Sequence, residues 1–203
     1  MMRKTIIAII MIVMILLLQA FSCAETGLLA FDSPTERETV YERKIAHKKT
    51  DADVFMASLD DVMKEELVRS VISENDEIKM AKMLWGEDRA NPMYMRAAII
   101  WCVYNRMDAG HESIDNIIND TSFPGYRESH PVKDWAVSLI RDVTIRYVLE
   151  LNGFTDVGRV LPKEYLFYEQ PEGKYYHIFK TKLKYNDPSN KVWDWSLPSP
   201  YND

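Results

Sequence analysis

The stretch that most constrains the fold of this chain runs from residue 79 to residue 106. Its pattern predicts a helix, a short polar break over residues 86–92 and then a second helix. Residues 97–104 of the second helix offer no polar face, so we expect this helix to be buried on all sides. The other elements of the domain are expected to be arranged around it.

Glu87 lies at the last turn of the first of these two helices, at the edge of its apolar face. Met80, Met83, Leu84 and Glu87 follow the spacing of one side of a helix. Partial burial disfavours a charged carboxyl, and the negative end of the helix dipole acts in the same direction. We therefore expect the Glu87 carboxyl to be held protonated near neutral pH, as a general acid requires. A solvated carboxylate, or an ion pair with Arg89, is the simpler interpretation of a single Glu in this position.

The composition is that of an ordinary globular protein, with 203 residues of which 47 % are hydrophobic and 28 % are charged. One domain is the expected number for this length. The formal net charge is −6, and it becomes −8 if Arg3 and Lys4 are removed with a leader, because 23 basic residues then face 31 acidic ones. Such a surface repels nucleic-acid phosphates and anionic lipid headgroups. We therefore exclude nucleic acid as a partner, and we exclude membrane binding through charge.

The N-terminus has the features of a secretory signal peptide. Arg3 and Lys4 precede an uncharged apolar run over residues 6–18, and small residues follow it. We therefore predict a leader over residues 1–24 and an extracytoplasmic location for the rest of the chain.

Two other outcomes at this leader stay open. Residues 6–24 could act as an uncleaved membrane anchor, although the apolar run is short for a bilayer span. Residues 20–23 resemble a bacterial lipobox, in which case Cys23 would carry the lipid. The membrane is thus a predicted partner only through this segment.

The remainder of the chain is predicted to be an α+β domain that is mostly helical and ends in a β-hairpin. Residues 25–51 are polar and lack a sustained period, which is typical of a tether, whereas residues 52–73 have the period of an amphipathic helix. We therefore divide the chain into a leader (1–24), a polar tether with an amphipathic helix (25–73) and a folded domain (74–203).

Within the folded domain the boundaries follow from capping and turn residues. Asn75 or Asp76 is the expected cap of the helix that ends near Glu87. Further helices are predicted over residues 113–119 and 131–151.

The last part of the chain changes period. Two β-prone runs over residues 165–168 and 175–181 are separated by a hairpin loop. Trp193 and Trp195 follow, and they either plug a groove or cover the core. Cys102 lies inside the apolar helix and is predicted to be a small buried hydrophobic residue.

Four segments, in this order, resemble the SleB-type cell-wall hydrolases, a bacterial family that includes spore-cortex-lytic enzymes. The family pattern Y-A-E-A-R-G-E resembles residues 84–91, LWGEDRAN, and its apolar helix ending in Asn-Arg resembles residues 99–107. Its Gln-Phe loop falls at Ser122 and Phe123. Its late aromatic segments resemble residues 166–168 and 175–179.

This resemblance implies a lysozyme-like fold and an enzyme that cleaves peptidoglycan glycan strands between N-acetylmuramic acid and N-acetylglucosamine. The family is commonly described as lytic transglycosylases, with no metal or cofactor. Glu87 would then be the catalytic residue. As an acid it would protonate the leaving oxygen, and as a carboxylate it would take a proton from the muramoyl 6-hydroxyl, which closes an anhydro ring.

The resemblance also suggests which residues contact the sugar. Phe123, Tyr126, Tyr168 and His177 are the candidates for the substrate groove, where they would stack on sugar faces or bind N-acetyl groups. Core packing is the alternative role for each aromatic residue. The expected location is the cell wall, reached by secretion or from a membrane anchor.

The chain departs from the family pattern at Ala90, Asn91 and Ser122, where the family has Gly, Glu and Gln. These departures leave a second hypothesis open, namely a catalytically inactive exported protein that binds or assembles the wall on the same scaffold. An amidase that cuts the stem peptide is a third hypothesis. It lacks support because the four histidines have no metal-binding spacing.

Overall fold

The structure is a computed structural model that describes residues 47–87, 91–110, 113–119, 125–170, 176–184 and 187–201. All of these residues belong to one compact unit, Lys44–Asp203. The predicted leader and most of the predicted tether lie outside the described residues, as do these residues named above: Cys23, Arg89, Ala90, Ser122 and Phe123.

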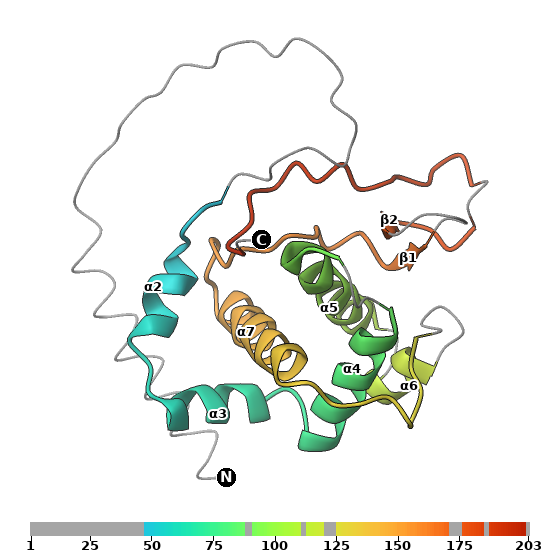
Figure 1. Cartoon of the computed structure of the whole chain (residues 1–203). Coiled ribbons are helices and arrows are strands. Elements are labelled where there is room, and N and C mark those ends of the chain that lie inside the picture. Colours follow the sequence, from blue (N-terminus) through green and yellow to red (C-terminus); the bar gives the residue numbers. More distant parts are fainter. Residues whose placement is uncertain are drawn as a thin grey trace, which may run out of the picture. The chain divides into compact units, whose positions relative to one another are not determined.

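Most of the described residues are helical (Figure 1). In chain order the elements are α2 (Asp51–Ala57), α3 (Asp61–Arg69), α4 (Glu74–Glu87), α5 (Met93–Asp108), α6 (Ile114–Asn119), α7 (Asp134–Leu151), β1 (Phe167–Glu169) and β2 (Ile178–Lys180). The two strands pair antiparallel, with Tyr168 opposite Phe179. The predicted α+β class, mostly helical with a small C-terminal sheet, is confirmed.

Helix α5 is the buried centre that the sequence predicts. Every residue from Ala97 to Tyr104 has an exposed fraction of 0 %. Helices α4, α6 and α7 and strand β1 contact α5, and Figure 1 shows α5 and α7 side by side. Burial raises the pKa of the Cys102 thiol, so this residue is a small core side chain, as predicted.

The single helix predicted over residues 52–73 is in fact two helices, α2 and α3. The break occurs because Asp60 caps α3, with its carboxylate accepting a hydrogen bond from the Met63 N–H at 2.8 Å. Both short helices pack against α7. The apolar period continued across the break, so periodicity alone could not reveal it.

Helix α4 begins with a reciprocal pair of hydrogen bonds. The Ser73 hydroxyl accepts from the Asp76 N–H, and the Asp76 carboxylate accepts from the Ser73 N–H, each at 3.1 Å. The prediction that Asn75 or Asp76 caps this helix was wrong, because Ser73 is the cap and Asp76 is its partner one turn later.

Glu77 of α4 is a buried carboxylate that connects α4 to two other helices. Its exposed fraction is 3 %, and it accepts hydrogen bonds from Arg69 of α3 and from Arg141 of α7, whose Nε lies 2.5 Å away. Burial opposes ionisation of Glu77, but the bonds from Arg141 and Arg69 outweigh it and lower the pKa of this carboxyl. Both arginines also pair with Glu65.

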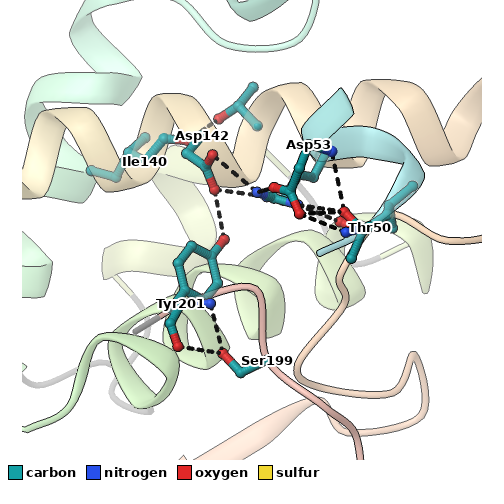
Figure 2. A network of polar contacts seen from close by, with 9 residues as sticks. Thr50, Asp53, Ile140, Asp142, Ser199 and Tyr201 are labelled. Carbon is teal, nitrogen blue, oxygen red and sulfur yellow. Dashed lines mark hydrogen bonds and ion pairs between the residues drawn. The ribbon is translucent and has the colours of Figure 1, made fainter. Parts of the chain in front are cut away.

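A second buried charge, Arg146 of α7, binds segments that are remote in the sequence. Its guanidinium donates to the Asp142 carboxylate at 2.8 Å, to the Thr50 hydroxyl at 3.3 Å and to the Val157 carbonyl at 3.0 Å, and it also pairs with Asp53. Figure 2 shows this network, in which the start of α2 is attached to the middle of α7.

The C-terminal segment joins the same network. The Tyr201 hydroxyl donates to the Asp142 carboxylate at 2.7 Å, and the Ser199 hydroxyl accepts from the Tyr201 N–H at 3.0 Å (Figure 2). Tyr201 is therefore held against α7, with Ser199 bonded to its backbone.

Of the two roles considered for the C-terminal tryptophans, covering the core is the one observed. Trp193 is 8 % exposed, and its indole N–H donates to the Val160 carbonyl at 3.1 Å. Trp195 packs edge-on against Tyr94 and Phe179, with ring centroids 5.1 Å and 5.5 Å apart.

We expect Glu77→Gln to lower the free energy of unfolding at pH 7 by about 3 kcal/mol, because two guanidinium groups lose the buried carboxylate that they share. Urea unfolding at equilibrium measures this change. Glu66→Gln is the matched control, since Glu66 is exposed on α3, and we expect it to change stability by less than about 0.5 kcal/mol.

The effect of Glu77→Gln should also depend on pH in a defined direction. The pKa of Glu77 in the folded state lies below its ordinary value of 4.5. Its contribution is therefore present above pH 4.5 and is lost as the pH falls through the folded-state pKa. The stability difference between the parent protein and the variant should shrink on acidification, and a difference that grows would contradict the ion-pair assignment.

Candidate functional site around Glu87

The Glu87 carboxyl is turned into the protein at the C-terminal end of α4. Its side chain is 7 % exposed. Oε1 accepts a hydrogen bond from the backbone N–H of Gly125, and Oε2 lies 3.6 Å from Nε2 of His177. Tyr168 interacts with the same carboxyl. Segments that are up to 90 residues apart in the sequence therefore meet at one acidic side chain.

Two glycines allow this meeting, because they let two backbone segments approach very closely. A Cβ atom on Gly86 would lie 1.8 Å from the Gly125 carbonyl oxygen, and a Cβ atom on Gly125 would lie 2.5 Å from Cγ of Glu87. No side chain fits at either distance. The approach of the two backbones is what places the Gly125 N–H on the carboxyl.

Tyr168 and His177 reach Glu87 from the small sheet. Tyr168 lies in β1 and His177 directly precedes β2, and their exposed fractions are 6 % and 2 %. Their rings meet edge to face, with centroids 5.0 Å apart and planes at 78°. Burial, and next the neighbouring Glu87 carboxyl, raises the pKa of Tyr168 well above its ordinary value, so this phenol stays protonated.

Tyr126 follows Gly125 and helps to fasten this loop to α4. Its hydroxyl donates to Glu128 at 2.5 Å, and this bond, followed by burial, raises the pKa of Tyr126 to about 12. Glu128 in turn pairs with Lys82 of α4. His130 Nδ1 lies 3.2 Å from the Lys82 carbonyl oxygen. The loop is thus attached to α4 at several points.

Tyr168 and His177 contact Glu87, and Tyr126 directly follows Gly125, whose N–H binds this carboxyl. Phe123 lies outside the described residues. The ring faces of Tyr168 and His177 are not open to solvent. Tyr126 is half-buried and keeps some exposed surface. A direct contact between these side chains and a sugar stays a prediction.

Asn105 was part of the family resemblance, but its task was not evident from the sequence. It is 1 % exposed, and its amide donates to the carbonyls of Pro162 and Tyr165 at 2.8 Å and 2.9 Å. Its own oxygen accepts from Arg159 at 2.6 Å. Asn105 therefore fixes the segment that leads into β1, and through it the position of Tyr168. The Gly125 N–H was also missed, because a backbone donor leaves no trace in a side-chain pattern.

A separate cavity of about 740 Å³ lies between α2, α3 and α7. Its lining includes Met56, Lys64 and Arg141, and it shares no residue with the group around Glu87.

Among the described residues, no set of three or more His, Cys, Asp or Glu side chains is arranged to hold a metal ion. In the same part of the chain no helix has both the length and the hydrophobicity of a membrane span.

Comparisons of the chain with protein-family models, with curated proteins and with solved structures found no match.

We expect Gly86→Ala to destabilise the protein by about 1–3 kcal/mol, as overpacking does. The sign of this change in stability is informative. Alanine is intrinsically a better helix residue than glycine by about 1 kcal/mol, so without a clash the substitution would stabilise the helix. Urea unfolding measures the stability, and amide hydrogen exchange at Gly125 reports whether its bond to Glu87 is lost.

Gly110→Ala is the control for this variant. Gly110 has a φ of 79° but nothing within 4 Å of the added Cβ, so it tests backbone strain without a clash. It should leave exchange at Gly125 unchanged. Unaltered protection of the Gly125 amide in Gly86→Ala would contradict the proposed close approach.

Proposed function

We propose that this chain is an exported peptidoglycan hydrolase with a lysozyme-like fold, a lytic transglycosylase that uses Glu87 as its general acid and base. The observation that carries the proposal is the setting of one carboxyl at a helix end. A backbone N–H, a tyrosine and a histidine from three other segments surround it. The predicted leader supports export, and the four ordered segments of the family resemblance support the substrate class.

The chemistry needs only one carboxyl. Ordinary glycosidases place two carboxyl groups across the scissile bond. Here the protonated Glu87 would give its proton to the glycosidic oxygen as the bond from the muramoyl C1 to that oxygen breaks. The resulting carboxylate would take the proton of the muramoyl 6-hydroxyl as that oxygen bonds to C1. Glu87 is thereby restored, and the products are an anhydromuramoyl end and a free N-acetylglucosamine end.

The two carboxyl oxygens have different surroundings, which suits this cycle. Oε1 accepts from the fixed Gly125 N–H, a bond that strengthens when the carboxyl becomes charged. Oε2 has no such backbone donor, and we assign it the exchange of the proton with the sugar. A donor that is in place before the reaction stabilises the developing charge without reorganisation.

One observation favours a second function, that of a catalytically inactive exported protein that binds or assembles the wall. With a side chain only 7 % exposed, Glu87 also serves to fasten the Gly125 loop to α4. A purely structural carboxyl would make the same contacts. The departures at Ala90, Asn91 and Ser122 from the family pattern point the same way.

Glu87→Gln separates the two functions. The glutamine amide oxygen can still accept from the Gly125 N–H, but the side chain cannot exchange a proton with the substrate. We expect the release of anhydromuropeptides from purified sacculi to fall at least about 100-fold, the lower range for loss of a general acid. Chromatography with mass spectrometry of the soluble products measures this release.

Glu74→Gln, an exposed carboxyl at the other end of α4, is the control and should keep full activity. Retained activity in Glu87→Gln would remove Glu87 from the mechanism. Binding to sacculi without product release by the parent protein would favour the inactive wall-binding function. Products cut at the stem peptide would identify an amidase.

A further inference from the structure

We infer that His177 is a positioning residue for Glu87, a neutral imidazole whose Nε2–H holds the Glu87 carboxylate between its two proton transfers. The inference rests on the proposed function, because it concerns the same carboxyl. It gives His177 a task different from the sugar contact that the sequence suggested.

The first observation is the burial of His177 without a hydrogen-bond partner in the described part of the chain. Its side chain is 1 % exposed, and neither ring nitrogen has a hydrogen-bond partner among the described residues. Buried polar groups are almost always hydrogen-bonded, since leaving one unpaired costs free energy. Packing alone does not explain a histidine in this position, because an apolar ring would fill the same space without the free-energy cost of an unpaired polar group.

The second observation is the distance between the His177 ring and the Glu87 carboxyl. Nε2 lies 3.6 Å from Oε2 of Glu87, whereas an N–H···O hydrogen bond is about 2.7–3.2 Å long. The two atoms are therefore close neighbours that are not hydrogen-bonded in this structure. The edge-to-face contact with Tyr168 fixes the ring plane. Shortening this separation by about 0.4 Å would bring the pair within hydrogen-bond range.

The other groups around Glu87 and His177 do not take up negative charge themselves. The negative charge of the proposed reaction therefore develops on the Glu87 carboxyl. Strand β1 contributes Tyr168, a phenol that burial keeps protonated. Helix α5 lies behind Tyr168, where Arg106 and Cys102 act on that phenol. The loop contributes the Gly125 N–H. The charge that appears when Glu87 releases its proton thus has two N–H donors available, Gly125 on Oε1 and His177 on Oε2.

Each proton in the proposed reaction has a defined donor and acceptor. Glu87 gives its proton to the glycosidic oxygen and recovers one from the muramoyl 6-hydroxyl, while His177 keeps its own proton on Nε2 throughout. Hydrogen bonds to a charged acceptor are shorter and roughly twice as strong as neutral ones. The His177 contact therefore stabilises the carboxylate more than the acid. A permanently charged imidazolium would instead hold Glu87 ionised from the start and prevent it from acting as an acid.

A pair of substitutions at His177 tests this assignment. The side-chain amide nitrogen of Gln reaches the place of Nε2, whereas that of Asn reaches only the place of Nδ1. We expect His177→Gln to keep kcat on soluble glycan strands within about threefold, and His177→Asn to lose about 10–100-fold in kcat with little change in KM, as for loss of one bond to a charged group. Thermal unfolding confirms that both variants fold. Equal losses in the two variants, or no loss in either, would overturn the inference.

A second measurement does not depend on activity or on any variant. In the parent protein at neutral pH, ¹⁵N NMR of the His177 ring should show a neutral imidazole with the proton on Nε2. A proton on Nδ1 instead, or a charged ring, would overturn the inference even if the enzyme is active. If the parent protein releases no muropeptides, the proposed function fails, and the ring measurement still decides how His177 faces Glu87.

Discussion

The complete burial of one helix is the constraint on which the rest of the structure depends. Helix α5 has no polar side between Ala97 and Tyr104, and none of these residues is exposed. Helices α4, α6 and α7 and strand β1 must therefore turn apolar surfaces toward it. At the far end of α5, Asn105 bonds to the segment before β1. The burial of α5 thus also places the small sheet, and with it the two residues that reach Glu87.

Three buried polar residues of this protein differ in how they are paired. Glu77 is held by two guanidinium groups, and Arg146 is held by two carboxylates, a hydroxyl and a carbonyl. These groups stabilise the packing of the helices. His177 is different, because it is equally buried and faces Glu87 without a bond. Stability alone does not account for a buried polar group without a hydrogen bond. Departures from the usual pairing of buried polar groups are expected at functional sites.

The contacts of Glu87 connect stability with the proposed activity. The Gly125 N–H fastens the loop to α4, and in the proposed mechanism the same bond would stabilise a negative charge on Oε1. Because the loop, the helix end and the sheet all contribute to one carboxyl, its geometry depends on the whole unit and not on one segment. If Glu87 is the general acid, as proposed, this support would hold its carboxyl in one orientation before substrate binds.

The sequence by itself determined the features that depend on residues close together along the chain, such as helices and strands. The apolar run over residues 97–104, which has no polar face, predicted the buried helix α5, and the late aromatic runs formed the predicted strand pair. Local competition between caps was harder to judge, so Ser73 was missed and the two helices α2 and α3 were predicted as one.

Only the tertiary structure decided the surroundings of Glu87. The sequence selected Glu87, Tyr168 and His177, but it could not show that both rings are buried behind the carboxyl. It also could not show that the Gly125 N–H binds this carboxyl. The physical reason is that a period or a cap acts over a few residues, whereas the contact between residues 87 and 177 exists because separate segments pack on α5 and bring their ends together.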